Sequence, residues 1–158
     1  MELEYFTDLQ QGPWRAAAVV AITAVIFVAI ALVLHRAGIE LLKRIARHRP
    51  YTTNAVKYAF RPSQIVAALF ALRLVLTGAP ETTPFLASIS RIVSVLLIVC
   101  LTWLAIACVN SIKKTISDLN PVDVLDNMRA RRVLTQTSVL TRSANAIIVL
   151  LGLGFMLL

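Results

Sequence analysis

The sequence predicts an all-α, polytopic helical membrane protein with about four transmembrane helices, an external N-terminus and an incomplete last span. Three observations predict it. The composition is 58% hydrophobic and only 15% charged, with a mean hydropathy of +0.78. The apolar residues gather into four runs, and uncharged runs of about 20 helical residues are long enough to cross a hydrocarbon layer of ~30 Å. The basic residues between the runs fall on alternate connections, as they do in membrane proteins with a defined orientation.

The first run, from Ala16 to Leu34, contains no charge, and the second is interrupted only by Arg73. The first run is also too long for a signal peptide, and the residues before it are acidic rather than basic. The predicted segments are, in order, an external tail (1–15), transmembrane helix 1 (16–35), a basic cytoplasmic connection (36–62), transmembrane helix 2 (63–78), a short external turn (79–85), transmembrane helix 3 (86–110), a cytoplasmic connection (111–142) and a truncated transmembrane helix 4 (143–158).

The distribution of basic residues predicts the orientation. The connection over 36–62 has one acid, Glu40, against seven basic residues, and the connection over 111–142 is also rich in lysine and arginine. The tail carries three acids and the turn over 79–85 has no basic residue. Positively charged loops stay in the cytoplasm, so we expect a multi-pass protein of the cell inner membrane with its tail outside. The same residues would meet anionic lipid headgroups, which explains the net charge of +8 without nucleic acid.

The cytoplasmic connections are themselves predicted to be partly helical. Apolar residues recur at helical spacing after Arg36, which indicates a basic helix that extends the first span along the membrane surface, or one that is merely solvated. Glu40 is expected to pair with Arg44 at i,i+4. Pro50 should end this helix, and a second break is expected before Pro62.

The third span is expected to continue as a helix to Leu119, where Asn120-Pro121 breaks it. Asp123 or Asp126 could then cap a new helix that runs without interruption into the fourth span.

Two arginines lie close to or within the apolar runs, Arg73 in the second and Arg91 just before the third. Both lie within about two helical turns of the predicted outer surface, so their guanidinium groups can reach the headgroups. The alternative is a functional charge or a buried ion pair, with Glu81 as the nearest partner for either arginine.

No pattern in the chain points to an enzyme, a bound metal or a cofactor, because it has no carboxylate pair, glycine-rich phosphate loop or Cys/His cluster. Cys100 and Cys108 are about 12 Å apart along one helix and cannot form a disulfide with each other. Gly152 and Gly154 are expected to permit close helix packing, and Asn145 could form a hydrogen bond to another helix.

A segment near the C-terminus carries a family resemblance. Residues 126–154 combine basic residues, a Thr-Gln pair, a leucine, an arginine and an isoleucine-rich span. This pattern resembles the segment that precedes the pore helix in many small-conductance mechanosensitive channels, the MscS-like family. The matching positions are Arg131, Arg132, Thr135, Gln136, Leu140, Arg142, Ile147 and Ile148.

The resemblance implies a homo-oligomer of seven copies, with a returning pore helix and a β-rich cytoplasmic domain that this sequence does not contain. We therefore expect a fragment or truncated product that carries the lipid-facing, tension-sensing helices of an ion channel for osmotic protection. Basic residues at the inner interface would anchor helix ends at the headgroups, or would simply follow the charge topology: Arg129, Arg131, Arg132 and Arg142. A non-conducting anchor or accessory subunit with a basic, lipid-binding inner face is the alternative function. Half of a small transporter is disfavoured, because no acid lies in any span.

Overall fold

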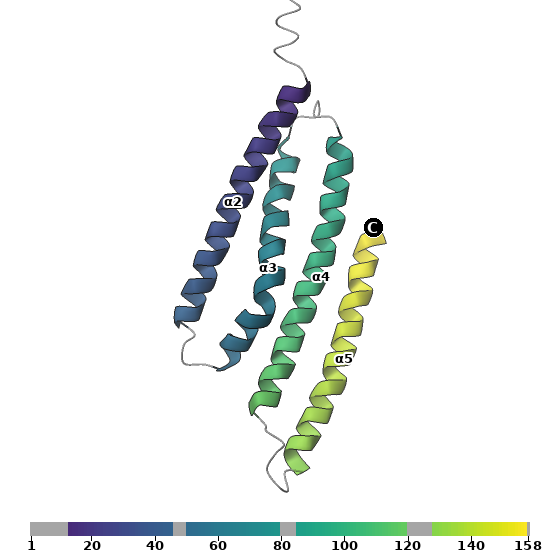
Figure 1. The fold of residues 1–158 in the computed structure, drawn as a ribbon. Coiled ribbons are helices and arrows are strands. Elements are labelled where there is room, and N and C mark those ends of the chain that lie inside the picture. Colours follow the sequence, from purple (N-terminus) through teal and green to yellow (C-terminus); the bar gives the residue numbers. More distant parts are fainter. Residues whose placement is uncertain (1–12, 46–49, 80–84, 120–127, 158) are drawn as a thin grey trace, which may run out of the picture.

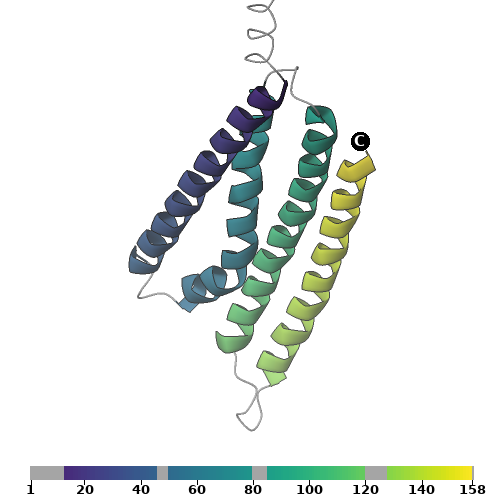
Figure 2. The same ribbon diagram turned by 45° about the horizontal axis from the view of Figure 1, so that its top comes forward.

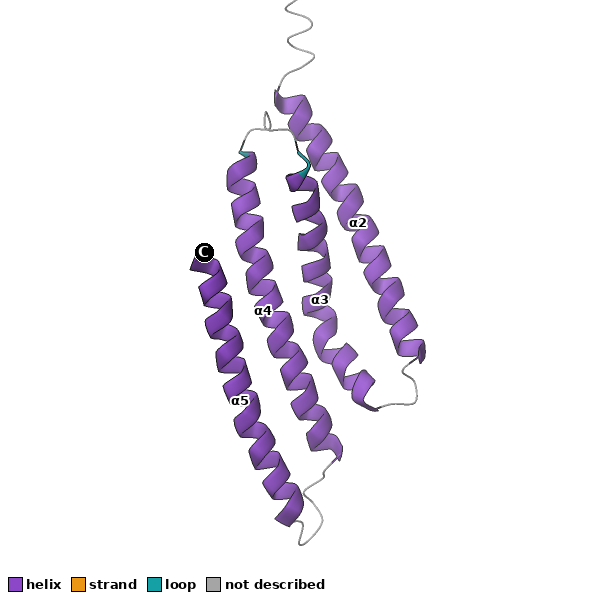
Figure 3. Cartoon of the chain, turned by 180° about the vertical axis from the view of Figure 1, so that it is seen from behind, coloured by secondary structure: helices purple, strands orange, loops and turns teal. Residues whose placement is uncertain are grey.

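The computed structural model describes residues 13–45, 50–79, 85–119 and 128–157, and these form four long helices. The helices are α2 (Pro13–Ile45), α3 (Pro50–Thr77), α4 (Leu86–Leu119) and α5 (Met128–Leu157). Among the described residues every regular element is helical (Figure 3). All four helices are long and apolar enough to cross a membrane, which confirms the predicted fold class at this level.

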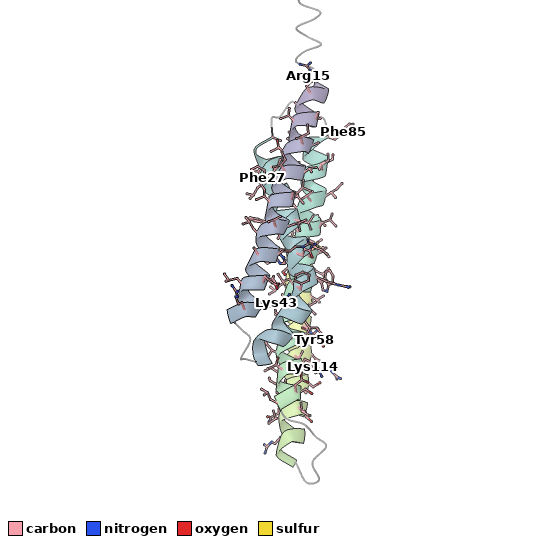
Figure 4. The ribbon with its side chains drawn as sticks, turned by 60° about the vertical axis from the view of Figure 1, so that its left-hand side comes forward. Arg15, Phe27, Lys43, Tyr58, Phe85 and Lys114 are labelled. Carbon is pink, nitrogen blue, oxygen red and sulfur yellow. The ribbon has the colours of Figure 1, made fainter. Side chains whose placement is uncertain are left out.

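The helices lie side by side as a single antiparallel row in chain order (Figure 1). Substantial packing occurs only between neighbours in sequence, namely α2 with α3, α3 with α4, and α4 with α5. When the molecule is turned, the helices overlap into a narrow profile, as expected for a layer one helix thick (Figure 4). The two outer helices, α2 and α5, each have one such neighbour.

Very few side chains in this row are buried. Few apolar residues are buried, and most of these are small. In the apolar window of α2 no residue is buried. Large apolar side chains are exposed along all four helices, including Val25 at 70% and Leu150 at 68%. Soluble monomers do not expose apolar surface on this scale. The apolar residues of these helices therefore face outward more than they face each other.

The central helix α4 uses two different faces for its two neighbours. At about 100° per residue, Ser90, Val93, Ala107, Ser111 and Thr115 share one side of the helix. Val93, Ala107, Ser111 and Thr115 are all buried. The residues that meet α5 lie on the opposite side, as the contacts described below show. Small side chains on the buried face let helix backbones approach closely, which replaces the bulky core of a soluble protein.

The helices extend beyond the apolar runs, largely as the sequence predicts. The first span continues as one helix through the basic segment to Ile45, and the third continues to Leu119. The helix that leads into the fourth span is also continuous from Met128. Asp123 and Asp126, the two predicted caps of this helix, lie outside the described residues.

The predicted break before Pro62 is wrong. Pro50 is the first residue of α3, a position where the missing N–H of proline is tolerated, and the helix then passes through Pro62. The ring of Pro62 is fully buried, and the Ser63 hydroxyl donates to the Phe60 carbonyl oxygen at 3.0 Å. The first part of α3 bends away from the axis of the rest (Figure 2), as expected near an internal proline.

Candidate functional site: the ends of the helices and the polar contacts between them

Charged side chains are concentrated at the end of the row where α2 and α4 finish and α3 and α5 begin. Figure 4 shows Lys43 and Lys114 toward this end, while Arg15 and Phe85 lie toward the other. The two predicted basic connections therefore lie on the same side of the molecule, which agrees with the up-and-down order of the helices. Glu40 pairs with Lys43 at 3.2 Å, so the predicted pairing with Arg44 is wrong. The i,i+3 spacing competes directly with i,i+4 on a helix surface.

The four predicted basic anchors do not lie at one level. Arg132 and Arg142 are both exposed, and they are separated by about 15 Å along α5. Arg142 lies near the level of Lys113, because Asn145 and Ser138 of the same helix contact Asn110 and Lys113 of α4. Arg129 and Arg131 belong to the first turns of α5, and their side chains lie outside the described residues. The basic end thus has at least two layers of cationic residues rather than one ring.

The residues of the family-like motif point away from the packed side of α5. Thr135, Gln136 and Leu140 are exposed, and Leu140 is 73% exposed. Thr141, in the same segment, is buried, and its hydroxyl donates to the Thr137 carbonyl oxygen at 2.7 Å. The side of α5 that carries Gln136 and Leu140 is therefore uncovered by protein in this chain.

The α4–α5 interface is held by an amide pair and a close backbone approach. The Asn145 Nδ2 donates to Asn110 Oδ1 at 3.3 Å, which confirms the predicted interhelical role of Asn145. Gly152 is buried against Thr102, and a Cβ added to Gly152 would lie 2.4 Å from Thr102 Oγ1. The prediction of close packing is therefore confirmed for Gly152. It is wrong for Gly154, because a Cβ there would meet nothing within 4 Å.

Between the described residues of α2 and α3 lies a polar contact that sequence reasoning missed. His35 Nε2 lies 2.9 Å from Ser63 Oγ, and the rings of His35 and Phe60 are 5.7 Å apart. Since the Ser63 hydroxyl hydrogen is used on the Phe60 carbonyl, Nε2 carries the proton and donates to Ser63. His35 Nδ1 is buried without a partner. The signal that could have found this pair is the presence of two polar residues near the same end of adjacent spans.

The α3–α4 interface contains Arg73, the charged residue within the second apolar run. Arg73 donates from Nη1 to Ser90 Oγ of α4, across a pocket of about 410 Å³. Arg73 is half-buried, whereas Arg91 is exposed. Glu81, the partner suggested by sequence for either arginine, lies outside the described residues. The rest of the pocket wall comes from Leu76, Thr77, Phe85, Leu86 and Ala87.

The described residues contain no cluster of three histidine, cysteine or acidic side chains able to hold a metal ion. Cys100 and Cys108 are both free thiols, as their spacing predicts. The polar groups between the helices therefore serve as contacts of one helix with the next. A scan against models of known protein families, a search of curated proteins and a search of solved structures each found no match to this chain.

Proposed function

We propose that the four helices cross the cell inner membrane as the tension-sensing helices of a mechanosensitive ion channel of the MscS-like kind, with the basic end in the cytoplasm. The resemblance of residues 126–154 supports the family, and the concentration of cationic residues at one end of the row supports the orientation. The wide exposure of apolar side chains supports insertion into lipid.

The observation that carries the proposal is the open row of helices. Lateral tension favours the state of larger in-plane area, in proportion to the difference in area between two states. A closed bundle must lose core packing before it can expand in this way. A row in which each helix packs mainly on its sequence neighbours can change its outline by tilting one helix at one interface.

The contacts indicate which helix moves. The α4–α5 pair is joined by the two asparagines and by the Gly152–Thr102 approach, and α3 is joined to α4 by Arg73 and Ser90. α2 is joined to α3 by the contact of His35 with Ser63, but no residue of its apolar window is buried. We therefore propose that tension displaces α2 relative to a more rigid α3–α5 unit. The basic residues at the inner interface hold the helix ends at the headgroup layer, so that thinning of the bilayer pulls on them.

The proposal includes self-association, with seven copies as the resemblance implies. In such an assembly the uncovered side of α5, with Gln136 and Leu140, faces the remainder of the channel, and α2 faces lipid. In the family that residues 126–154 resemble, ions pass through a separate pore helix, so the proposed role of these four helices is mechanical rather than chemical.

Energy transfer between two fluorophores tests the movement of α2. The full chain, with its native cysteines replaced by serine, is labelled at Leu34 of α2 and Ile112 of α4, both of which are exposed. In liposomes under osmotic tension, or in thin bilayers, we expect the Leu34–Ile112 distance to change. For a control pair of labels at Ile112 of α4 and Val139 of α5, the distance should not change. The asparagine pair and the Gly152–Thr102 approach hold that interface together.

The outcome separates the proposal from the alternative of a passive anchor. If both pairs stay constant as tension rises, the sensing role is wrong and the non-conducting anchor with a basic lipid-binding face is favoured. A variant with the inner basic residues changed to glutamine tests the anchoring step, because it should weaken the response of the Leu34–Ile112 pair: Arg129, Arg131, Arg132 and Arg142. An unchanged response in this variant would show that these residues only follow the charge topology.

A further inference from the structure

The pocket between α3 and α4 contains a charged side chain, Arg73, that has few partners among the described residues. Arg73 lies four residues before Thr77, the last residue of α3, and Ser90 lies four residues after Leu86, the first residue of α4. Both side chains are therefore about 6 Å, or one helical turn, inside the ends of their helices. Among the described residues, one of the five guanidinium N–H groups has an acceptor, in the bond to Ser90. Within the described part of the chain no carboxylate contacts Arg73.

A half-buried guanidinium at this depth needs an anion or other polar groups around it. An arginine in a membrane segment remains charged, and it is stable there when a counter-charge or polar groups solvate it. Ser90 adds a second donor, because its Oγ accepts from Arg73 and its own hydroxyl hydrogen is free to donate. Thr77 contributes no further donor, since its hydroxyl donates to the Arg73 carbonyl oxygen at 2.8 Å. The polar part of the pocket is thus one guanidinium and one hydroxyl that converge on the same space.

The remaining wall of the pocket is apolar. It therefore favours an anion that carries an apolar group. Leu76, Leu86 and Phe85 line the pocket beside Arg73. Phe85 adopts a left-handed backbone conformation, with φ of 60°, immediately before α4. A bulky residue rarely adopts this conformation. A free, fully hydrated phosphate would gain nothing from these hydrocarbon surfaces, whereas an acyl or glycerol group would bury apolar area on them.

We propose that this pocket binds the phosphodiester of a membrane glycerophospholipid. Arg73 and Ser90 donate to the phosphate oxygens, and the glycerol and first acyl carbons lie on Leu76, Leu86 and Phe85. The planar guanidinium matches two phosphate oxygens at once, which a lysine cannot do. This inference rests on membrane insertion but is independent of the channel function, so either can fail without the other.

Native mass spectrometry of the purified full chain tests the site. Released from micelles that contain phosphatidylglycerol, the protein should retain bound lipid, and Arg73→Gln should lower the occupancy by about tenfold or more, as expected for loss of charge-assisted hydrogen bonds. Arg91→Gln is the matched control, because it removes an equal charge from an exposed site beside Ser90. We expect Arg91→Gln to retain the lipid. Ser90→Ala, which keeps the helix intact, should lower the lipid occupancy several-fold. It tests the same pocket independently if the Arg73 variant misfolds.

Three further arms identify the ligand. Diacylglycerol, which lacks the phosphate, should not bind, and inorganic phosphate should not displace the phospholipid. Displacement by inorganic phosphate would overturn the lipid assignment and leave a free-anion site. Equal lipid retention by the Arg73 and Arg91 variants would overturn the proposal. Lipid binding that occurs only in the Glu81→Gln variant would also overturn the proposal, because Arg73 would then be paired with Glu81 within the chain.

Discussion

The approach of α5 to α4 at Gly152 can be tested by adding a single methyl group. In Gly152→Ala the new Cβ would lie 2.4 Å from Thr102 Oγ1 and 3.0 Å from Thr102 Cγ2. The shorter separation falls about 1 Å or more below an ordinary van der Waals contact, so the helices must separate or Thr102 must rotate. Rotation of Thr102 would break the hydrogen bond from its Oγ1 to the Ile98 carbonyl oxygen, which is 2.8 Å long. Overpacking of this kind costs about 1–3 kcal/mol.

Gly154 provides the matched control, since a Cβ there would meet nothing within 4 Å. Gly154→Ala should be neutral, or stabilising by up to about 1 kcal/mol through its better helix propensity. The two alanine variants should therefore differ by about 2 kcal/mol in the free energy of unfolding. The assay is titration of the micelle-embedded protein with sodium dodecyl sulfate, followed by tryptophan fluorescence.

A double variant isolates the contact. Thr102→Ala removes the two atoms that lie within 3.0 Å of the added Cβ and leaves the Thr102 Cβ at 3.3 Å. Combined with Gly152→Ala, it should restore most of the lost stability. The reasoning is refuted if Gly152→Ala is as stable as Gly154→Ala, or if Thr102→Ala gives no rescue.

Three other features of the row give testable expectations, two of them in the same detergent system. A double-mutant cycle on Asn110 and Asn145 should yield a coupling energy of about 0.5–1.5 kcal/mol, and a value near zero would mean that the amide pair does not hold α4 to α5. Ser63→Ala leaves His35 Nε2 without its acceptor at 2.9 Å, so it should destabilise the α2–α3 interface by about 1–2 kcal/mol; a neutral effect would contradict that contact. A spin label at Val25, which is 70% exposed, should collide with oxygen but hardly with a water-soluble nickel chelate in liposomes. Strong collision with the chelate would place α2 outside lipid.

Sequence reasoning captured the parts of the fold that depend on hydropathy alone. The four apolar runs, the helical extension to Ile45 and the continuation to Leu119 all follow from residue type and period, and the structure agrees. The break expected before Pro62 failed because a local rule was overridden: the proline ring is fully buried within a continuous helix. Propensity describes an isolated helix in water, whereas here neighbouring helices fix the path.

The contacts between helices were harder to foresee, because they depend on rotation and depth. Gly152 and Gly154 look equivalent in sequence, and only the rotation of α5 decides which of them meets Thr102. In the same way, nothing in the sequence selects Ser90 as the residue opposite Arg73. Side chains of an antiparallel pair are matched by register, and a shift of one turn would have offered Arg73 a different neighbour.

The thinness of the row affects how the protein tolerates change. In a globular domain most apolar residues are held by the shape of their neighbours, and even one methylene more or less is felt. On α2, where no residue of the apolar window is buried, almost any exchange among Val, Ile, Leu and Ala keeps the same fit. Natural variation should therefore run freely along α2 so long as hydropathy is kept. It should be restricted at the few positions where two backbones or two polar groups meet, such as Gly152 and Asn145.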